Sequence, residues 1–165
     1  MTNELNKSTM IKRDDINEIV LKKAFEFFYW FSRFEFCLKE RGYLKSKQNG
    51  ARAEPGWKGF VKEFESQYSQ SKDAQSLVSL KPSQQKVGHN ELLVWEEINV
   101  KNDNELQQVV STLKTIRNNL FHGGKHSIEG WDDIERTEIL LVMGVLVIKE
   151  IVKMAGWEDD FERIY

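Results

Sequence analysis

The sequence predicts an all-α fold, a bundle of four or five helices whose first, third and fourth members are long. Apolar residues recur every three or four positions through three long segments, which is the period of a helix. The chain has only two prolines, Pro55 and Pro82, and both lie in segments with the composition of loops. Folds built from many short strands carry more turn-forming residues than this.

The first helix is predicted to begin near Asp14 and Asp15 and to end at about Arg41, where Gly42 is a suitable stop. Its apolar positions at helical spacing are Ile16, Ile19, Val20, Phe27, Phe31, Phe34 and Leu38. Further aromatic residues lie on its other faces, namely Phe25, Phe28, Tyr29, Trp30 and Phe36. A helix that is apolar around most of its circumference must be covered from several sides. We therefore expect a central core helix, or one shared between the core and a subunit interface.

The middle of the chain is patterned more weakly. Residues 42–56 have the composition of a loop, and residues 57–69 predict a second helix with Trp57 and Phe60 on its apolar side. From there to residue 90 we expect short helical turns and a surface loop. Residues 91–98 are compatible with a short strand or with a helical turn.

Two more long helices follow. The third is predicted from Asp103 or Asn104, both good capping residues, to Gly123. The fourth is predicted from residues 131–133 to Ala155, with Gly156 as its stop. Its apolar run, residues 139–148, is rich in β-branched residues and would also suit a buried strand. The charged flanks, which favour helix, and the total length favour a buried helix.

Composition narrows the class of protein. The 165 residues carry a formal net charge of -2, which excludes a strongly basic surface but allows a local basic patch. We expect a flexible N-terminus, residues 1–13, before a single helical domain, residues 14–165. A lone cysteine, Cys37, fits a reducing compartment. No signal peptide is visible, and the longest apolar run is far shorter than the roughly 20 residues that cross a bilayer, so a cytoplasmic protein without a membrane partner is expected.

The end of the third predicted helix carries unusual residues. The helix has an apolar stripe formed by Leu106, Val109, Val110, Leu113, Ile116 and Leu120. Arg117 falls inside this stripe, where a guanidinium needs a carboxylate, a ligand anion or a solvated cleft. His122 follows on the last turn, where the helix dipole favours its protonated form. Gly123 then suits a helix stop, and Lys125 adds a positive charge.

The pattern Arg117-Asn118-x-x-x-His122 resembles the R-x4-6-H signature of the HEPN superfamily, small helical domains of bacterial toxin, antiphage and RNA-processing systems. An asparagine after the arginine is a common form of that signature, and an apolar helix follows it here too. The resemblance covers the motif closely and the helical layout loosely. It implies a HEPN-like bundle as the fold.

The resemblance also implies an activity. HEPN domains dimerise so that two motifs face one cleft, and competent members resemble metal-independent endoribonucleases that act through the ribose 2′-OH. Arg117, His122 and Asn118 would then be catalytic, Lys125 and Asn119 would bind substrate, and Glu35 and Arg33 of the first helix would support them. RNA, a second copy of the chain and a cognate antitoxin or regulatory protein are the implied partners, and no cofactor or metal is required.

Other interpretations remain open. Arg117 could be a core residue paired with Glu35 or Glu26 of the first helix. A HEPN-like scaffold could bind RNA or regulate a partner without cleaving, which the modest net charge favours. An unrelated helical protein could use exposed aromatic residues as a dimer surface. His122 and His126 have a metal-like spacing, but two glycines break the helix between them, so we expect no metal site.

Overall fold

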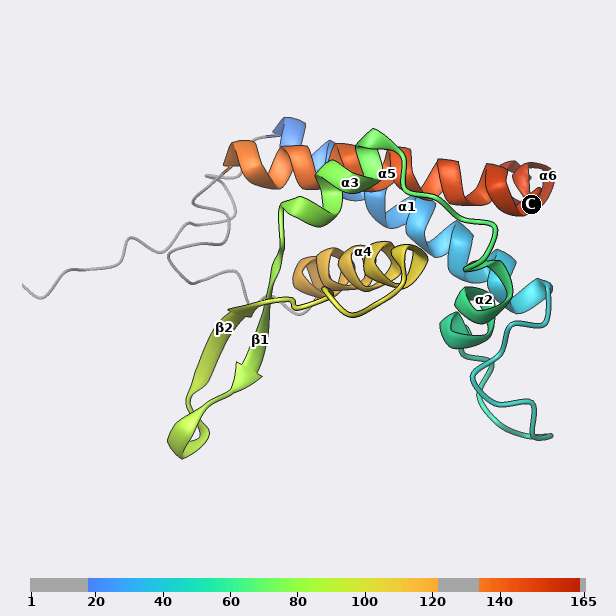
Figure 1. The fold of residues 1–165 in the computed structure, drawn as a ribbon, viewed down its shortest axis with the longest axis horizontal. Coiled ribbons are helices and arrows are strands. Elements are labelled where there is room, and N and C mark those ends of the chain that lie inside the picture. Colours follow the sequence, from blue (N-terminus) through green and yellow to red (C-terminus); the bar gives the residue numbers. More distant parts are fainter. Residues whose placement is uncertain (1–17, 122–133, 164–165) are drawn as a thin grey trace, which may run out of the picture.

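The structure is a computed structural model, and it describes residues 18–121 and 134–163. It is mostly helical, which confirms the coarse prediction of the fold class, and the three helices predicted to be long are long (Figure 1). The helices are α1 (Glu18–Glu40), α2 (Trp57–Phe64), α3 (Lys72–Ser79), α4 (Glu105–Phe121), α5 (Ile134–Ala155) and α6 (Glu158–Glu162). A small sheet pairs β1 (Ser83–Val87) with β2 (Leu93–Glu97), and a short 3-10 turn, η2 (His89–Glu91), lies between them.

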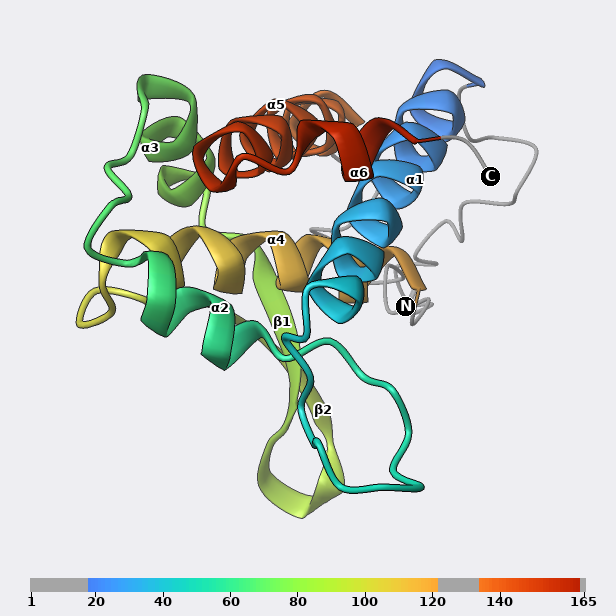
Figure 2. The same ribbon diagram turned by 90° about the vertical axis from the view of Figure 1, so that its right-hand side faces the viewer.

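The helices form two layers that α1 joins. In Figure 2, α5 and α6 lie above, α4 and α2 lie below, and α1 crosses from the upper layer to the lower one. At the crossing of α1 and α5 the ring of Phe27 packs on Gly144, and a Cβ at Gly144 would lie only 2.6 Å from its Cε2 atom. The glycine therefore sets how closely the two helices approach. No helix in the described ranges is long and apolar enough to span a membrane.

The predicted ends of α1 and α5 and the predicted start of α4 are confirmed by the structure. Gly42 and Gly156 follow α1 and α5 with φ of +78° and +68°, a conformation that glycine adopts without steric cost. The N–H of Tyr43 donates to the carbonyl of Leu38 at 2.8 Å and closes the end of α1. The side chain of Asn104 caps α4 by accepting a hydrogen bond from the third backbone N–H beyond it, at 2.8 Å.

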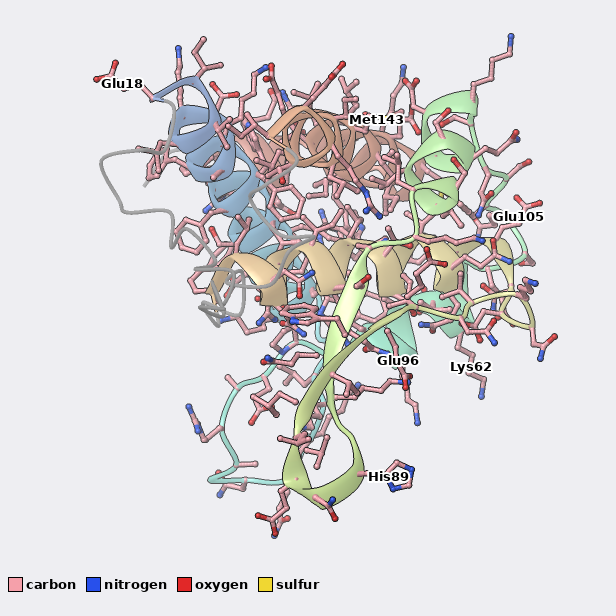
Figure 3. All side chains as sticks on the ribbon, turned by 90° about the vertical axis from the view of Figure 1, so that its left-hand side faces the viewer. Glu18, Lys62, His89, Glu96, Glu105 and Met143 are labelled. Carbon is pink, nitrogen blue, oxygen red and sulfur yellow. The ribbon has the colours of Figure 1, made fainter. Side chains whose placement is uncertain are left out.

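The β-hairpin is the main departure from the predicted all-α fold. Residues 83–87, which were expected in a helical turn or loop and hold a single apolar residue, Val87, form β1. The segment 91–98, which was compatible with a strand or a helical turn, contains β2. Asn90 and Glu91 join the strands with φ of 54° and 61°, the left-handed pair of a type I′ turn. Figure 3 shows His89 at the tip of this hairpin, which projects away from the helices.

An aromatic cluster fills the core where α1, α2 and α6 meet. Phe34 and Phe60 are fully buried, and their rings contact Trp57 and Trp157. Cys37 is buried on the same side of α1, and burial raises the pKa of its thiol. The second helix ends at Phe64, earlier than predicted, and α6 was not predicted at all. Short helices of this kind depend on packing and are weakly encoded by local sequence.

Candidate functional site

The site is built where α1 and α4 pack. Arg117 projects from the buried side of α4, and its Nη2 donates a hydrogen bond of 3.1 Å to Oε1 of Glu35 on α1. The two side chains are 28% and 22% exposed, so the pair is neither sealed inside the core nor free in solvent. A carboxylate was one of the three partners expected for this guanidinium, and the structure provides it.

Two aromatic side chains also contact the pair. Trp57 donates its indole Nε1–H to the same Oε1 of Glu35 at 3.3 Å. The ring of Phe31 lies 5.3 Å from the guanidinium carbon of Arg117, within the range of a cation–π contact. In the described part of the chain the buried Nε–H of Arg117 has no acceptor, and Oε2 of Glu35 accepts no hydrogen bond. The arginine is thus fixed in direction while part of its donor capacity stays unused.

A hollow of about 150 Å³ opens beside the pair. Its lining comes from one face of each helix: Phe28, Phe31, Ser32, Glu35, Arg117 and Phe121. The rings of Phe28 and Phe121 contact each other with 5.0 Å between centroids. Both residues are partly open to solvent, with relative exposures of 40% and 53%. The hollow therefore combines exposed aromatic walls with a charged pair.

Two lysines lie close enough to Arg117 and Glu35 to interact with them or with each other electrostatically. Lys114 lies one helical turn before Arg117 and is partly buried. Burial lowers the pKa of its ammonium group, the charge of Arg117 lowers it further, and Glu35 acts in the opposite direction. Lys45, in the loop after α1, adds to the same field. Of these three cations Arg117 has the printed bond to Glu35, and Lys45 is itself paired with Glu54 at 2.9 Å. Lys114 is therefore the cation that adds to the charge of Arg117 on α4.

The structure separates some of the predicted site residues from this hollow. Asn119 donates its side-chain N–H to the backbone carbonyl of Ser83 at 2.8 Å and so ties α4 to the hairpin, which accounts for it without substrate. Arg33 points toward α6, where it donates to the carbonyls of Asp160 and Phe161 at 2.7 and 3.1 Å. It sits on a different face of α1 from Glu35, because two helical positions are about 200° apart. Neither residue lines the hollow.

Of the remaining predicted site residues, the structure describes Asn118 but not His122 or Lys125. Asn118 is exposed on α4 directly after Arg117. His122 and Lys125 lie outside the described residues, as does the predicted helix stop at Gly123. Of the three histidines in the sequence only His89 is described, and it stands at the hairpin tip, far from α4 (Figure 3).

Several residues of the site were missed in the sequence. The missed residues are Phe28, Phe31 and Ser32 of α1 and Phe121 of α4. Phe28 and Ser32 precede the predicted Glu35 by seven and three positions, which places them on its face of α1, and Phe121 follows Arg117 by four. The spacing can be read from the sequence, but it does not single out this face, because α1 carries aromatic residues on nearly every face. Which of its faces meets α4 is decided by packing.

Within residues 18–121 and 134–163, no cluster of three histidine, cysteine, aspartate or glutamate side chains is arranged to hold a metal ion. Comparison with known proteins found no matching family model, no similar curated protein and no similar solved structure. The oriented arginine and the hollow beside it are therefore the observations on which a function can be based.

Proposed function

We propose that the chain is a metal-independent endoribonuclease of the HEPN type, which cleaves RNA in a cleft formed by two copies of the chain. Its biological role would be that of a cytoplasmic toxin or antiphage effector. One observation carries the proposal, namely that Arg117 is oriented by Glu35 beside an open hollow and is not sealed in the core. A guanidinium held in this way is ready to meet a phosphate without reorganising.

Arg117 supplies electrostatic stabilisation in this proposal. Its planar guanidinium presents several donors, and only Nη2 is engaged by a described acceptor. The Nη N–H groups that Glu35 does not use suit the extra negative charge that develops on a phosphorane, whereas the Nε–H is buried. Lys114 reinforces the positive potential from one turn away. Asn118, exposed beside Arg117, is suited to hold a phosphate oxygen.

The proposed reaction needs a base and an acid but no metal. The 2′-OH of the ribose loses its proton to a base and its oxygen attacks the adjacent phosphorus. The bond from phosphorus to the 5′ oxygen breaks, and that oxygen takes up a proton. The products are a 2′,3′-cyclic phosphate and a 5′-OH. His122 is assigned the proton transfers because imidazole titrates near neutral pH, and it enters the proposal, like Lys125, from the sequence motif alone.

The alternative is a HEPN-like module that binds RNA or a regulatory partner, such as a cognate antitoxin, without cleaving. The same ion pair favours it in one respect, since Glu35 neutralises much of the charge that Arg117 offers to RNA. The net charge of -2 acts in the same direction, because affinity for RNA depends largely on neutralising phosphates.

A cleavage assay separates the two functions. Wild-type protein, Arg117→Ala, Arg117→Lys, His122→Ala and a control, Arg52→Ala, are incubated with mixed RNA, with and without EDTA. Arg52 is an exposed loop arginine outside the hollow. We expect EDTA-resistant cleavage that leaves 2′,3′-cyclic phosphate ends in the wild type and Arg52→Ala, and a loss of at least about 100-fold in the other three.

Two results would contradict the nuclease. Equal degradation of RNA by all five proteins would mean that a contaminant cleaves, and RNA binding without cleavage by the wild type would establish the non-catalytic module. The shared cleft has its own test, the mass in solution. A light-scattering mass of 19.4 kDa at micromolar concentration, the mass of a single chain, would rule out the dimer.

A further inference from the structure

The hollow between α1 and α4 has the size of one aromatic ring. Its volume is about 150 Å³, and an apolar cavity of about 150 Å³ holds a benzene molecule, whereas sites for drug-sized ligands take roughly 300–1,000 Å³. A single planar ring therefore fills the hollow. A dinucleotide cofactor or the helix of a partner protein is too large for it.

The walls suit stacking. Phe28 lines the hollow from α1 and Phe121 lines it from α4, and both residues are partly exposed. Covering such phenylalanine rings with a flat apolar surface removes them from water, which lowers the free energy. A base lying on an aromatic ring provides such a surface, whichever nucleobase it is, because every base has a π-face.

The polar end of the hollow distinguishes a nucleobase from a plain aromatic side chain. Oε1 of Glu35 already accepts from Arg117 and Trp57, while Oε2 accepts from no described residue. A phenyl ring in the hollow would leave that oxygen without a donor. A nucleobase brings N–H groups on its edge, and a carboxylate, which can only accept, pairs best with an amino group.

From these observations we propose that the hollow binds one unstacked pyrimidine base of single-stranded RNA, and that Glu35 favours cytosine, which has an exocyclic amino group, over uracil. Uracil has no amino group, and its one ring N–H stands between two carbonyl oxygens that face the carboxylate unfavourably. The inference rests on the proposed function in that RNA is taken as the ligand. It assigns to Phe28, Phe121 and Glu35 the choice of base, while Arg117 acts on the phosphate.

A binding assay tests this without requiring cleavage. The probes are fluorescent nonamers of cytidine and of uridine with 2′-O-methyl riboses, which lack the attacking hydroxyl, and the measurement is anisotropy with the full-length protein. The wild type is expected to bind the cytidine nonamer about tenfold more tightly than the uridine nonamer. Phe28→Leu and Phe121→Leu are expected to weaken binding of both probes by about tenfold, because leucine keeps the apolar contact but removes the flat ring.

Two further variants sharpen the test. Phe25→Leu makes the same change on α1 at a residue that is 66% exposed and outside the hollow, so it should bind as the wild type does. Glu35→Gln keeps one oxygen for Arg117 and Trp57 and turns the free acceptor into a donor, so it should lose the preference for cytidine. Thermal melts followed by circular dichroism verify that each variant is folded.

The outcomes are separable from those of the nuclease test. Equal affinity of the wild type for both probes, or equal behaviour of Phe28→Leu and Phe25→Leu, overturns the base site. Preference for cytidine in binding, with no cleavage of the unmodified cytidine nonamer, supports the base site and ends the nuclease proposal. If the wild type and Phe28→Leu cleave both unmodified nonamers at the same rate, the nuclease proposal is supported and the base site is overturned.

Discussion

Glu35 and Arg117 are 82 residues apart in the sequence, yet a 3.1 Å hydrogen bond joins the Oε1 of one to the Nη2 of the other. The bond ties α1 to the last turns of α4. Both side chains are less than one third exposed, so water screens their attraction only in part. The pair therefore contributes to the stability of the fold and, in our proposal, also to the orientation of the site.

Replacing Glu35 by alanine should lower the free energy of unfolding by about 1–3 kcal/mol, because both Arg117 and Trp57 lose their acceptor. A double-mutant cycle with Arg117→Met, followed by urea unfolding, should give a coupling energy of about 0.5–2 kcal/mol. The exposed pair of Lys45 and Glu54 is the control, and its coupling should be smaller. Additive effects of the two substitutions would contradict a stabilising pair.

Gly144→Ala should destabilise the protein by about 1–2 kcal/mol although alanine favours helix, because the buried ring of Phe27 occupies the space of the new Cβ. Gly59→Ala in α2 is the matched control. A Cβ there would meet a Tyr43 carbon at 3.6 Å, an ordinary contact, so this change should stabilise by roughly 0.5–1 kcal/mol. Thermal melts measure both changes, and a stabilising Gly144→Ala would mean that α1 and α5 pack less tightly than described.

Glu91→Gly should strengthen the hairpin. Glu91 holds φ at +61° in the type I′ turn, which costs about 1 kcal/mol for a residue with a Cβ and nothing for glycine. Amide hydrogen exchange should slow at Leu92 and Gly88, whose N–H groups bond across the turn. Glu91→Ala keeps the Cβ and should leave exchange unchanged; slower exchange in that variant as well would point to charge as the cause.

Lys114 should make stability depend on pH. Burial lowers the pKa of its ammonium group in the folded chain, so the unfolded chain binds more protons once the pH exceeds that lowered value. Stability should therefore rise with pH toward the ordinary lysine pKa of about 10.4. Above pH 10 the raised pKa of Tyr43, about 12 by burial and the nearby Glu63, acts in the opposite direction.

Comparison with Lys114→Met isolates this effect. Urea midpoints are measured between pH 8 and pH 10 for both proteins. The difference between them should favour the variant most at the lowest pH and shrink as the pH rises. A difference that is constant over this range would show that Lys114 titrates like a free lysine.

The helical scaffold could be predicted because its signals are local. The spacing of apolar residues indicated α1, α4 and α5, and Gly42, Asn104 and Gly156 marked helix ends that the structure confirms. A cap or a stop depends on residues within one turn of each other, so the sequence is sufficient to place it. The hairpin was missed for the converse reason. Residues 83–87 have little strand propensity, and their pairing with β2 is set by the register of the two strands.

The sequence by itself determined that Arg117 stands on an apolar stripe and must find a partner or an anion, because an isolated guanidinium cannot be buried. Only the tertiary structure decided that Glu35, and not Glu26, is the partner, that Asn119 holds the hairpin, and that Arg33 faces α6. The physical reason lies in the angle and depth at which α1 meets α4. Contacts between residues 82 positions apart follow from the packing of whole helix faces, and no local pattern in either helix specifies them.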